Sequence, residues 1–196
     1  MRIATWNVNS LNKRMPRVEE WLGYAKPDVL CLQETKLSDA NFPSMAFAAL
    51  GYESAHCGQG QWNGVAILSR VGLDDVVAGF PDQADDEVTE ARLLWAMCGG
   101  VRVLSVYVPN GRQVDTEHYF AKLEWLERLR SGLDKASDPT EPFVMCELPR
   151  DRAFRRADDL SDFTRAHPGQ SAEVNQHGSR NPRLDNVVRR RLGRYV

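Results

Sequence analysis

The chain has 196 residues and a mass of 22.2 kDa, which is enough for one domain with a proper core and too little for two ordinary ones. Its 42% hydrophobic, 9% aromatic and 27% charged residues exclude a wholly disordered chain, a collagen-like fibre and a membrane protein. The longest apolar runs are strand-sized, and the N-terminus shows no apolar signal-peptide region. We therefore expect a cytoplasmic protein.

The predicted elements mix strands and helices from the N-terminus onwards. Residues 2–8 alternate weakly between apolar and polar side chains and predict a strand, after which Ser10 is expected to cap a helix that runs to about residue 24. Residues 29–32 form a short, fully apolar run, which is typical of a strand buried on both faces. Further strands are predicted at residues 52–56, 64–69, 73–77, 92–97, 101–108 and 142–146, and further helices at residues 43–50 and 117–130.

The helix at residues 117–130 has the clearest periodicity in the chain. One of its faces is expected to carry the apolar side chains of Tyr119, Phe120, Leu123, Leu126 and Leu129. Between residues 51 and 108, consecutive strands are joined by tight turns, which favours two packed sheets flanked by helices over a regular parallel array. After residue 146 the pattern weakens, with helical stretches indicated within residues 150–167 and a short strand near residues 184–188.

Composition also changes near residue 147, although the net charge of the whole chain is only −2. Residues 147–196 contain eleven Arg, no Lys and seven acidic residues, so this part is net basic and the part before it is net acidic. The basic run at residues 189–191 is open to two interpretations, a DNA-binding patch or a solvated tail. The four cysteines are widely spaced and form no Cys-x-x-Cys pair, which favours reduced, buried thiols over a zinc or redox site.

Two short motifs place oxygen ligands at the ends of predicted strands. Asn7 follows the first strand within Thr-Trp-Asn-Val-Asn, and Glu34 follows the next within Leu-Gln-Glu-Thr-Lys. If these strands are neighbours, the two side chains converge at one edge of a sheet and supply a carboxylate and an amide oxygen, which Mg²⁺ accepts as ligands. The alternative is that Glu34 is a solvated acid at a strand end and Asn7 a turn residue.

Four motifs occur in a specific order: ATWNVNSL, PDVLCLQETK, NGVAILSR and YVPNGR. Over residues 1–146 the chain resembles the exonuclease III family of AP endonucleases, within the endonuclease/exonuclease/phosphatase superfamily. The resemblance implies a single domain over residues 1–196 with an α/β fold. This fold is a four-layer α-β-β-α sandwich of two mixed sheets flanked by helices. We expect the second sheet to be incomplete. It also implies Mg²⁺- or Mn²⁺-dependent hydrolysis of DNA phosphodiesters at abasic sites and 3′ ends, in base excision repair, by a monomer that binds DNA and no membrane.

The resemblance also assigns roles to individual residues. Glu34 matches the metal-binding glutamate, and Asn7 matches the asparagine that helps to place the metal and the nucleophile. Tyr107 matches the active-site tyrosine, whose phenol can donate a hydrogen bond to the reacting phosphate; a half-buried strand aromatic is the alternative. The positions expected to lie near the metal or to contact DNA and its phosphates are Asn9, Lys36, Asn110 and Arg112.

After residue 146 the chain departs from the family's pattern. The family's Gly-Asp-x-Asn motif, which handles the nucleophilic water and stabilises the transition state, is replaced by Glu-Leu-Pro-Arg at residues 147–150. Asp185 matches the aspartate that orients the catalytic histidine, and an acid in a loop or at a strand edge is the alternative. The Ser-Asp-His motif that supplies this histidine is absent from the sequence. We therefore expect either a nuclease with impaired activity or a truncated, catalytically inactive relative that is at most a nucleic-acid-binding remnant.

Overall fold

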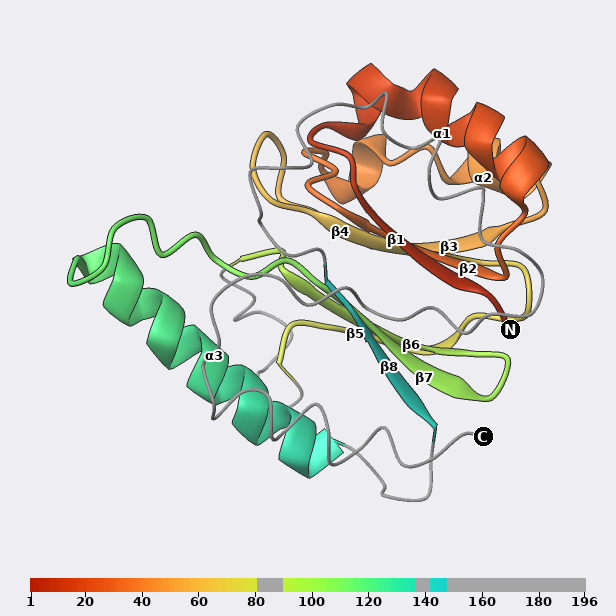
Figure 1. Cartoon of the computed structure of the whole chain (residues 1–196). Helices are drawn as coiled ribbons and strands as arrows, with labels where there is room; N and C mark the ends of the chain where they lie inside the picture. Colours follow the sequence, from red (N-terminus) through yellow and green to blue (C-terminus); the bar gives the residue numbers. More distant parts are fainter. Residues whose placement is uncertain (81–89, 137–141, 148–196) are drawn as a thin grey trace. The chain divides into compact units, whose positions relative to one another are not determined.

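The computed structural model describes residues 1–80, 90–136 and 142–147, all within the first of the two compact units into which the chain divides, Met1–Leu148 (Figure 1). The strands are β1 (Ile3–Asn7), β2 (Val29–Gln33), β3 (Glu53–Cys57), β4 (Val65–Ser69), β5 (Asp74–Ala78), β6 (Leu93–Cys98), β7 (Val101–Val106) and β8 (Phe143–Cys146). The helices are α1 (Leu11–Ala25), α2 (Ser44–Ala49), α3 (Glu117–Ala136) and the short 3-10 helix η1 (Asp39–Asn41). Within the described ranges, no helix combines the length and the apolar composition that crossing a bilayer requires.

The first sheet contains four strands in the order β1-β2-β4-β3. β1 and β2 are parallel, with Asn7 opposite Gln33 at their C-terminal ends, whereas β4 is antiparallel to both of its neighbours. Every residue of β2 and β4 is buried, as expected for central strands that are covered on both faces. The prediction for residues 29–32 is thereby confirmed.

The second sheet has the order β5-β6-β7-β8. β6 is antiparallel to both of its neighbours, β5 and β7, whereas β8 is parallel to β7. Gly99 and Gly100 join β6 to β7 with φ of 55° and 79°, the left-handed values that a two-residue hairpin turn requires. Each sheet therefore mixes parallel and antiparallel pairs, as predicted.

Three apolar clusters fill the spaces between the layers. α1 and α2 cover the first sheet, where Leu22 and Phe47 pack with Leu30 and Leu68. The cluster between the two sheets contains Val29, Cys31, Val65, Ile67, Leu94, Ala96, Cys98 and Val103. The cluster of the second sheet contains Trp95, Leu104 and Val106 together with residues of α3. The predicted four-layer α-β-β-α sandwich is thus confirmed (Figure 1), and all four cysteines are buried and unbridged, as expected.

Three details of the helices differ from the prediction. Ser10 does not cap α1 through its side chain, because its backbone has a φ of 85° and its N–H donates instead to the carbonyl oxygen of Glu34 at 2.7 Å. On the predicted apolar face of α3, Leu126 and Leu129 pack on the second sheet beside Trp125, whereas Phe120 and Leu123 are exposed, at 54% and 42%. The helix also continues to Ala136, beyond its predicted end at residue 130. Helical spacing alone does not determine which part of a broad apolar face packs on the sheet.

Candidate active site

The parallel arrangement of β1 and β2 brings the two predicted oxygen ligands to the same edge of the first sheet. Asn7 ends β1, and Glu34 is the first residue after β2. Their side chains meet: Nδ2 of Asn7 donates a hydrogen bond to Oε1 of Glu34 at 2.9 Å. The predicted convergence of Asn7 and Glu34 is therefore confirmed, and Glu34 is not a free solvated acid.

Four side chains close a ring of contacts around this carboxylate. We call Asn7, Asn9, Glu34 and Lys36 the Glu34 cluster. Nζ of Lys36 lies 3.2 Å from Oε2 of Glu34 and donates to Oδ1 of Asn9 at 2.5 Å. The backbone N–H of Asn9 then donates to Oδ1 of Asn7 at 3.1 Å, which completes the ring. Both polar ends of the Asn7 side chain are occupied within the protein, so Asn7 orients Glu34 in this structure.

The cluster keeps Glu34 ionised although its side chain is only 17% exposed. Burial by itself raises the pKa of this carboxyl group, but side-chain hydrogen bonds from Asn7, Tyr107 and Lys36, with the positive charge of Lys36, lower the pKa below its ordinary value. A carboxylate that stays charged at neutral pH offers oxygen atoms that a divalent cation can bind. Glu34 is therefore suited to hold a metal ion at neutral pH.

Tyr107 reaches the same site from the second sheet, one residue beyond β7. Its backbone N–H donates to the carbonyl oxygen of Arg92 at 2.8 Å. The guanidinium group of Arg92 lies 4.9 Å from the centroid of the Tyr107 ring and also pairs with Glu90. This stacking holds the phenol ring in place, so that its hydroxyl group bonds Glu34 across the space between the two sheets.

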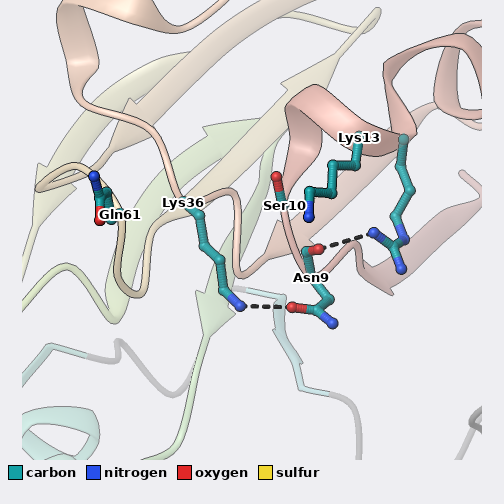
Figure 2. Close-up of a pocket in the computed structure, with 6 residues that line it drawn as sticks. Asn9, Ser10, Lys13, Lys36 and Gln61 are labelled. Atoms are coloured by element: carbon teal, nitrogen blue, oxygen red, sulfur yellow. Dashed lines mark hydrogen bonds between the residues drawn. The ribbon is translucent and has the colours of Figure 1, made fainter.

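A pocket with cationic side chains in its lining includes Asn9 and Lys36 of the Glu34 cluster (Figure 2). It is lined by Asn9, Ser10, Lys13, Arg14, Lys36 and Gln61. Nη1 of Arg14 donates to the carbonyl oxygen of Asn9 at 2.9 Å, while Nζ of Lys36 bonds the side chain of the same residue. Three cationic side chains beside one ionised carboxylate form a surface that suits a phosphate group.

The remaining predicted site residues lie farther along the chain. Asn110 and Arg112 occupy an exposed turn after β7, where the backbone N–H of Arg112 donates to Oδ1 of Asn110 at 3.0 Å. Arg112 has a φ of 52°, so the turn is sharp at this residue. Asp185 lies outside the described residues, as does the basic run at residues 189–191.

Buried polar residues beneath the site were not singled out from the sequence. Gln33 is 1% exposed and donates to Oγ1 of Thr5 at 3.0 Å and to Oγ of Ser105, in the other sheet, at 3.4 Å. Ser105 in turn donates to the carbonyl oxygen of Leu32 at 3.3 Å. These bonds link the two sheets directly below Glu34. The detectable signal was a glutamine at the end of a fully apolar strand, where a polar side chain needs a partner.

The oxygen ligands at the site fit a divalent cation that retains several coordinated water molecules. Glu34 supplies one carboxylate, and no group of three or more His, Cys, Asp or Glu side chains gathers anywhere in the described part of the chain. Mg²⁺ is commonly held by one or two carboxylates together with water and substrate phosphate, whereas zinc requires several strong protein ligands. The described residues of the site therefore fit a divalent metal ion.

Comparisons with known proteins agree with this geometry. A family model described as the Endonuclease/Exonuclease/phosphatase family matches residues 4–146. Exodeoxyribonuclease III from Haemophilus influenzae is 31% identical over 150 residues, which cover 74% of this chain and 55% of the relative. An AP endonuclease structure from Archaeoglobus fulgidus is similar with a TM-score of 0.70 and 41% identity, covering 74% of this chain and 56% of that one.

A third relative was solved with DNA. The 3′ phosphatase NExo from Neisseria, bound to product DNA hairpin, is similar with a TM-score of 0.68 and 39% identity, covering 74% of this chain and 56% of that one. The chain thus spans about half the length of these relatives. Because the family model covers both sheets and every described residue of the site, the chain belongs to the Endonuclease/Exonuclease/phosphatase family.

Proposed function

We propose that the chain is a divalent-metal-dependent DNA phosphodiester hydrolase of the exonuclease III type, which uses Mg²⁺ or Mn²⁺ at abasic sites and 3′ ends in base excision repair. The observation that carries the proposal is the ionised Glu34, held by Asn7 and Lys36 from one sheet and by Tyr107 from the other. The exodeoxyribonuclease III and AP endonuclease names of the relatives support it.

In this proposal each residue of the site has a separate task. Glu34 would hold the metal ion, which when bound neutralises negative charge on the phosphate oxygens. Asn7 and Lys36 keep the carboxylate in one orientation, so no reorganisation is needed when a phosphate enters. Tyr107 presents a phenol hydroxyl beside Glu34, from where it can donate to a phosphate oxygen.

DNA is the partner that the surface beside the Glu34 cluster fits. Lys13, Arg14 and Lys36 face one pocket, and their charges neutralise backbone phosphates without regard to base sequence. Asn110 and Arg112, in the exposed turn that follows Tyr107, are proposed as further phosphate contacts. Asp185 is proposed as the family's orienting aspartate. The monomeric state and the cytoplasmic location stay predictions.

We propose that this activity is impaired. β8 is parallel to β7, so its C-terminal end lies at the same edge of the second sheet as Tyr107. The residues that follow β8 would belong to the site, but the sequence there is Glu-Leu-Pro-Arg in place of Gly-Asp-x-Asn. A positioned general base contributes about 10²–10⁴-fold to such reactions. We therefore expect slow cleavage, with DNA binding retained.

The test is cleavage of an abasic-site duplex by the purified chain with Mg²⁺ or Mn²⁺, compared with a complete family member. We expect measurable but much slower cleavage, which Glu34→Gln abolishes. The matched control is Glu20→Gln, because Glu20 is an exposed glutamate on α1 that pairs only with Arg17 among its described ion pairs. DNA binding without cleavage would favour the inactive nucleic-acid-binding relative, and cleavage that survives Glu34→Gln would refute the assigned site.

A further inference from the structure

A buried histidine lies behind the loop that carries Glu34 and Lys36. His56 is on the edge strand β3, and its side chain is only 4% exposed. Its ring stacks on Phe42 at 4.2 Å with an interplanar angle of 14°. Nε2 of the ring lies 2.8 Å from Oγ1 of Thr35, a residue that is completely buried between Glu34 and Lys36.

The surroundings of His56 favour a neutral ring. Burial lowers the pKa of the imidazole, and nearby Asp39 only partly opposes this effect. Nδ1 lies 2.7 Å from Oδ1 of Asp39 without hydrogen-bond geometry, so Asp39 acts on the ring through its charge. Nε2 accepts the hydroxyl proton of Thr35 when the ring proton is on Nδ1.

The backbone leaves room for this pair of side chains at two glycines. A Cβ atom on Gly64, whose φ is 92°, would lie 2.1 Å from Oγ1 of Thr35. A Cβ atom on Gly58 would lie 2.2 Å from Cε1 of His56. A side chain at position 64 would displace the Thr35 hydroxyl group, and one at position 58 would meet both the His56 ring and the carbonyl oxygen of Leu37. The two side chains are therefore closely packed against the backbone.

The loop itself needs such an anchor because two of its residues are strained. Glu34 and Lys36 have φ of 54° and 53°, in the left-handed region that residues with a Cβ atom rarely occupy. Backbone bonds hold all three residues of the loop. The carbonyl of Glu34 accepts from Ser10 at 2.7 Å, the N–H of Thr35 donates to Gly64 at 3.1 Å, and the N–H of Lys36 donates to Asn63 at 3.0 Å. The side chain of Thr35 points away from the site, towards His56.

We infer that His56 is a positioning residue, which acts through Thr35 to hold Glu34 and Lys36 in their left-handed conformations. Backbone bonds fix where Thr35 lies, and the bond to His56 fixes how it is rotated about the chain. When the side chain of Thr35 is directed towards His56, the side chains of Glu34 and Lys36 lie on the opposite side of the loop. There Glu34 bonds Asn7 and Lys36 bonds Asn9. This inference rests on the proposed function, because it assigns His56 to the same metal-holding loop.

The experiment has one readout for the loop and one for the metal site. Backbone NMR chemical shifts of Glu34 and Lys36 report their left-handed φ, and Mn²⁺ binding followed by electron paramagnetic resonance reports the site. Thr35→Val keeps the shape of the side chain and removes the hydroxyl group. We expect it to move both residues out of the left-handed region and to weaken Mn²⁺ binding about tenfold, the lower end for loss of an outer-shell partner.

Two further variants separate positioning from general stability. His56→Gln keeps a polar group near the position of Nε2, and we expect it to retain more Mn²⁺ affinity than His56→Leu. Ser69→Ala is the control: Ser69 is an equally buried hydroxyl, which donates to Gly72 at 2.7 Å at the far end of β4, and its loss is expected to change neither readout.

The outcomes distinguish the inference from the proposed function. Left-handed shifts and Mn²⁺ affinity that survive in Thr35→Val and His56→Leu would overturn the inference. A folded wild-type chain without Mn²⁺ binding would instead contradict the proposed function, while the NMR shifts still decide the role of His56. If the variants do not fold, the wild-type spectrum decides: a solvent-protected Thr35 hydroxyl proton near the His56 ring is expected, and its absence would refute the contact.

Discussion

Replacing Asn7 by alanine breaks the Glu34 cluster at two points. Nδ2 no longer donates to Oε1 of Glu34 at 2.9 Å, and Oδ1 no longer accepts from the backbone N–H of Asn9 at 3.1 Å. The first bond has a charged acceptor whose side chain is 17% exposed, so water replaces it only in part. The second bond lies at an exposed position, where water replaces it readily.

The expected magnitudes follow from these two losses. A hydrogen bond to a charged group contributes about 1.5–3 kcal/mol and an exposed neutral one less than about 1 kcal/mol, so the free energy of unfolding should fall by about 2 kcal/mol. Because Asn7 orients the carboxylate that we assign to the metal, Mn²⁺ affinity should fall by about tenfold or more. Asn12→Ala is the matched control, because Asn12 is an exposed asparagine on α1.

The same variant should change the pH dependence of metal binding. Burial raises the pKa of Glu34, and the hydrogen bonds, of which Asn7 supplies one, lower it below its ordinary value. Protons compete with the metal for the carboxylate, so wild-type binding should persist until the pH falls through this lowered pKa. In Asn7→Ala the pKa rises, and binding should therefore be lost at a higher pH.

The assay combines urea unfolding with Mn²⁺ titrations followed by electron paramagnetic resonance over a range of acidic and neutral pH. An Asn7→Ala protein with wild-type Mn²⁺ affinity and the same pH midpoint would refute the reasoning, because the cluster would then not control Glu34. A fall in stability with no change in either metal readout would reduce Asn7 to a structural residue.

Two further predictions use matched pairs of residues. In urea unfolding, Gly64→Ala should lower the free energy of unfolding by about 3 kcal/mol, because the left-handed φ adds strain and the Cβ atom meets Thr35. Gly60 also has a positive φ, of 102°, but it faces open space, so Gly60→Ala should lower the free energy of unfolding by only about 1 kcal/mol. Equal costs would show that the contact with Thr35 is unimportant. In DNA-binding titrations, Lys13→Ala should flatten the slope of log affinity against log salt by about 0.9, whereas Arg17→Ala, which removes an exposed partner of Glu20 on the same helix, should not. Equal slopes in both variants would remove the pocket from the DNA surface.

Much of the fold could be predicted because its signals are local. The apolar run of β2, the glycine pair at Gly99 and Gly100 and the regular spacing in α3 each reflect a property of a short segment. The predicted strands therefore agree with the observed ones to within about two residues at each end. The predicted apolar face of α3 was wrong in part, because Leu126 and Leu129 pack on the sheet but Phe120 and Leu123 are exposed. Which residues pack depends on how the helix is rotated against the sheet, and spacing does not determine that rotation.

The candidate site divides in the same way. Asn7, Glu34 and Tyr107 could be named from motifs, because each stands in a short and specific run of residues. His56 could not, because its partner Thr35 is 21 positions away and the two meet only when β3 and the end of β2 lie in one sheet. Arg92 was missed for the same reason, since its contact with Tyr107 forms across β6 and β7.

The sequence by itself determined the layers of the fold, the family and the residue types at the site, because apolar periodicity and short motifs are properties of neighbouring residues. It also determined that the Gly-Asp-x-Asn motif is replaced after residue 146. Only the tertiary structure decided that both polar ends of Asn7 are occupied, that the pKa of Glu34 is lowered despite burial, and that Thr35 joins the site loop to His56. These features depend on distances between atoms from separate strands. Such distances exist only once the strands of the first sheet have paired and, for the contact of Tyr107 with Glu34, once the two sheets have packed.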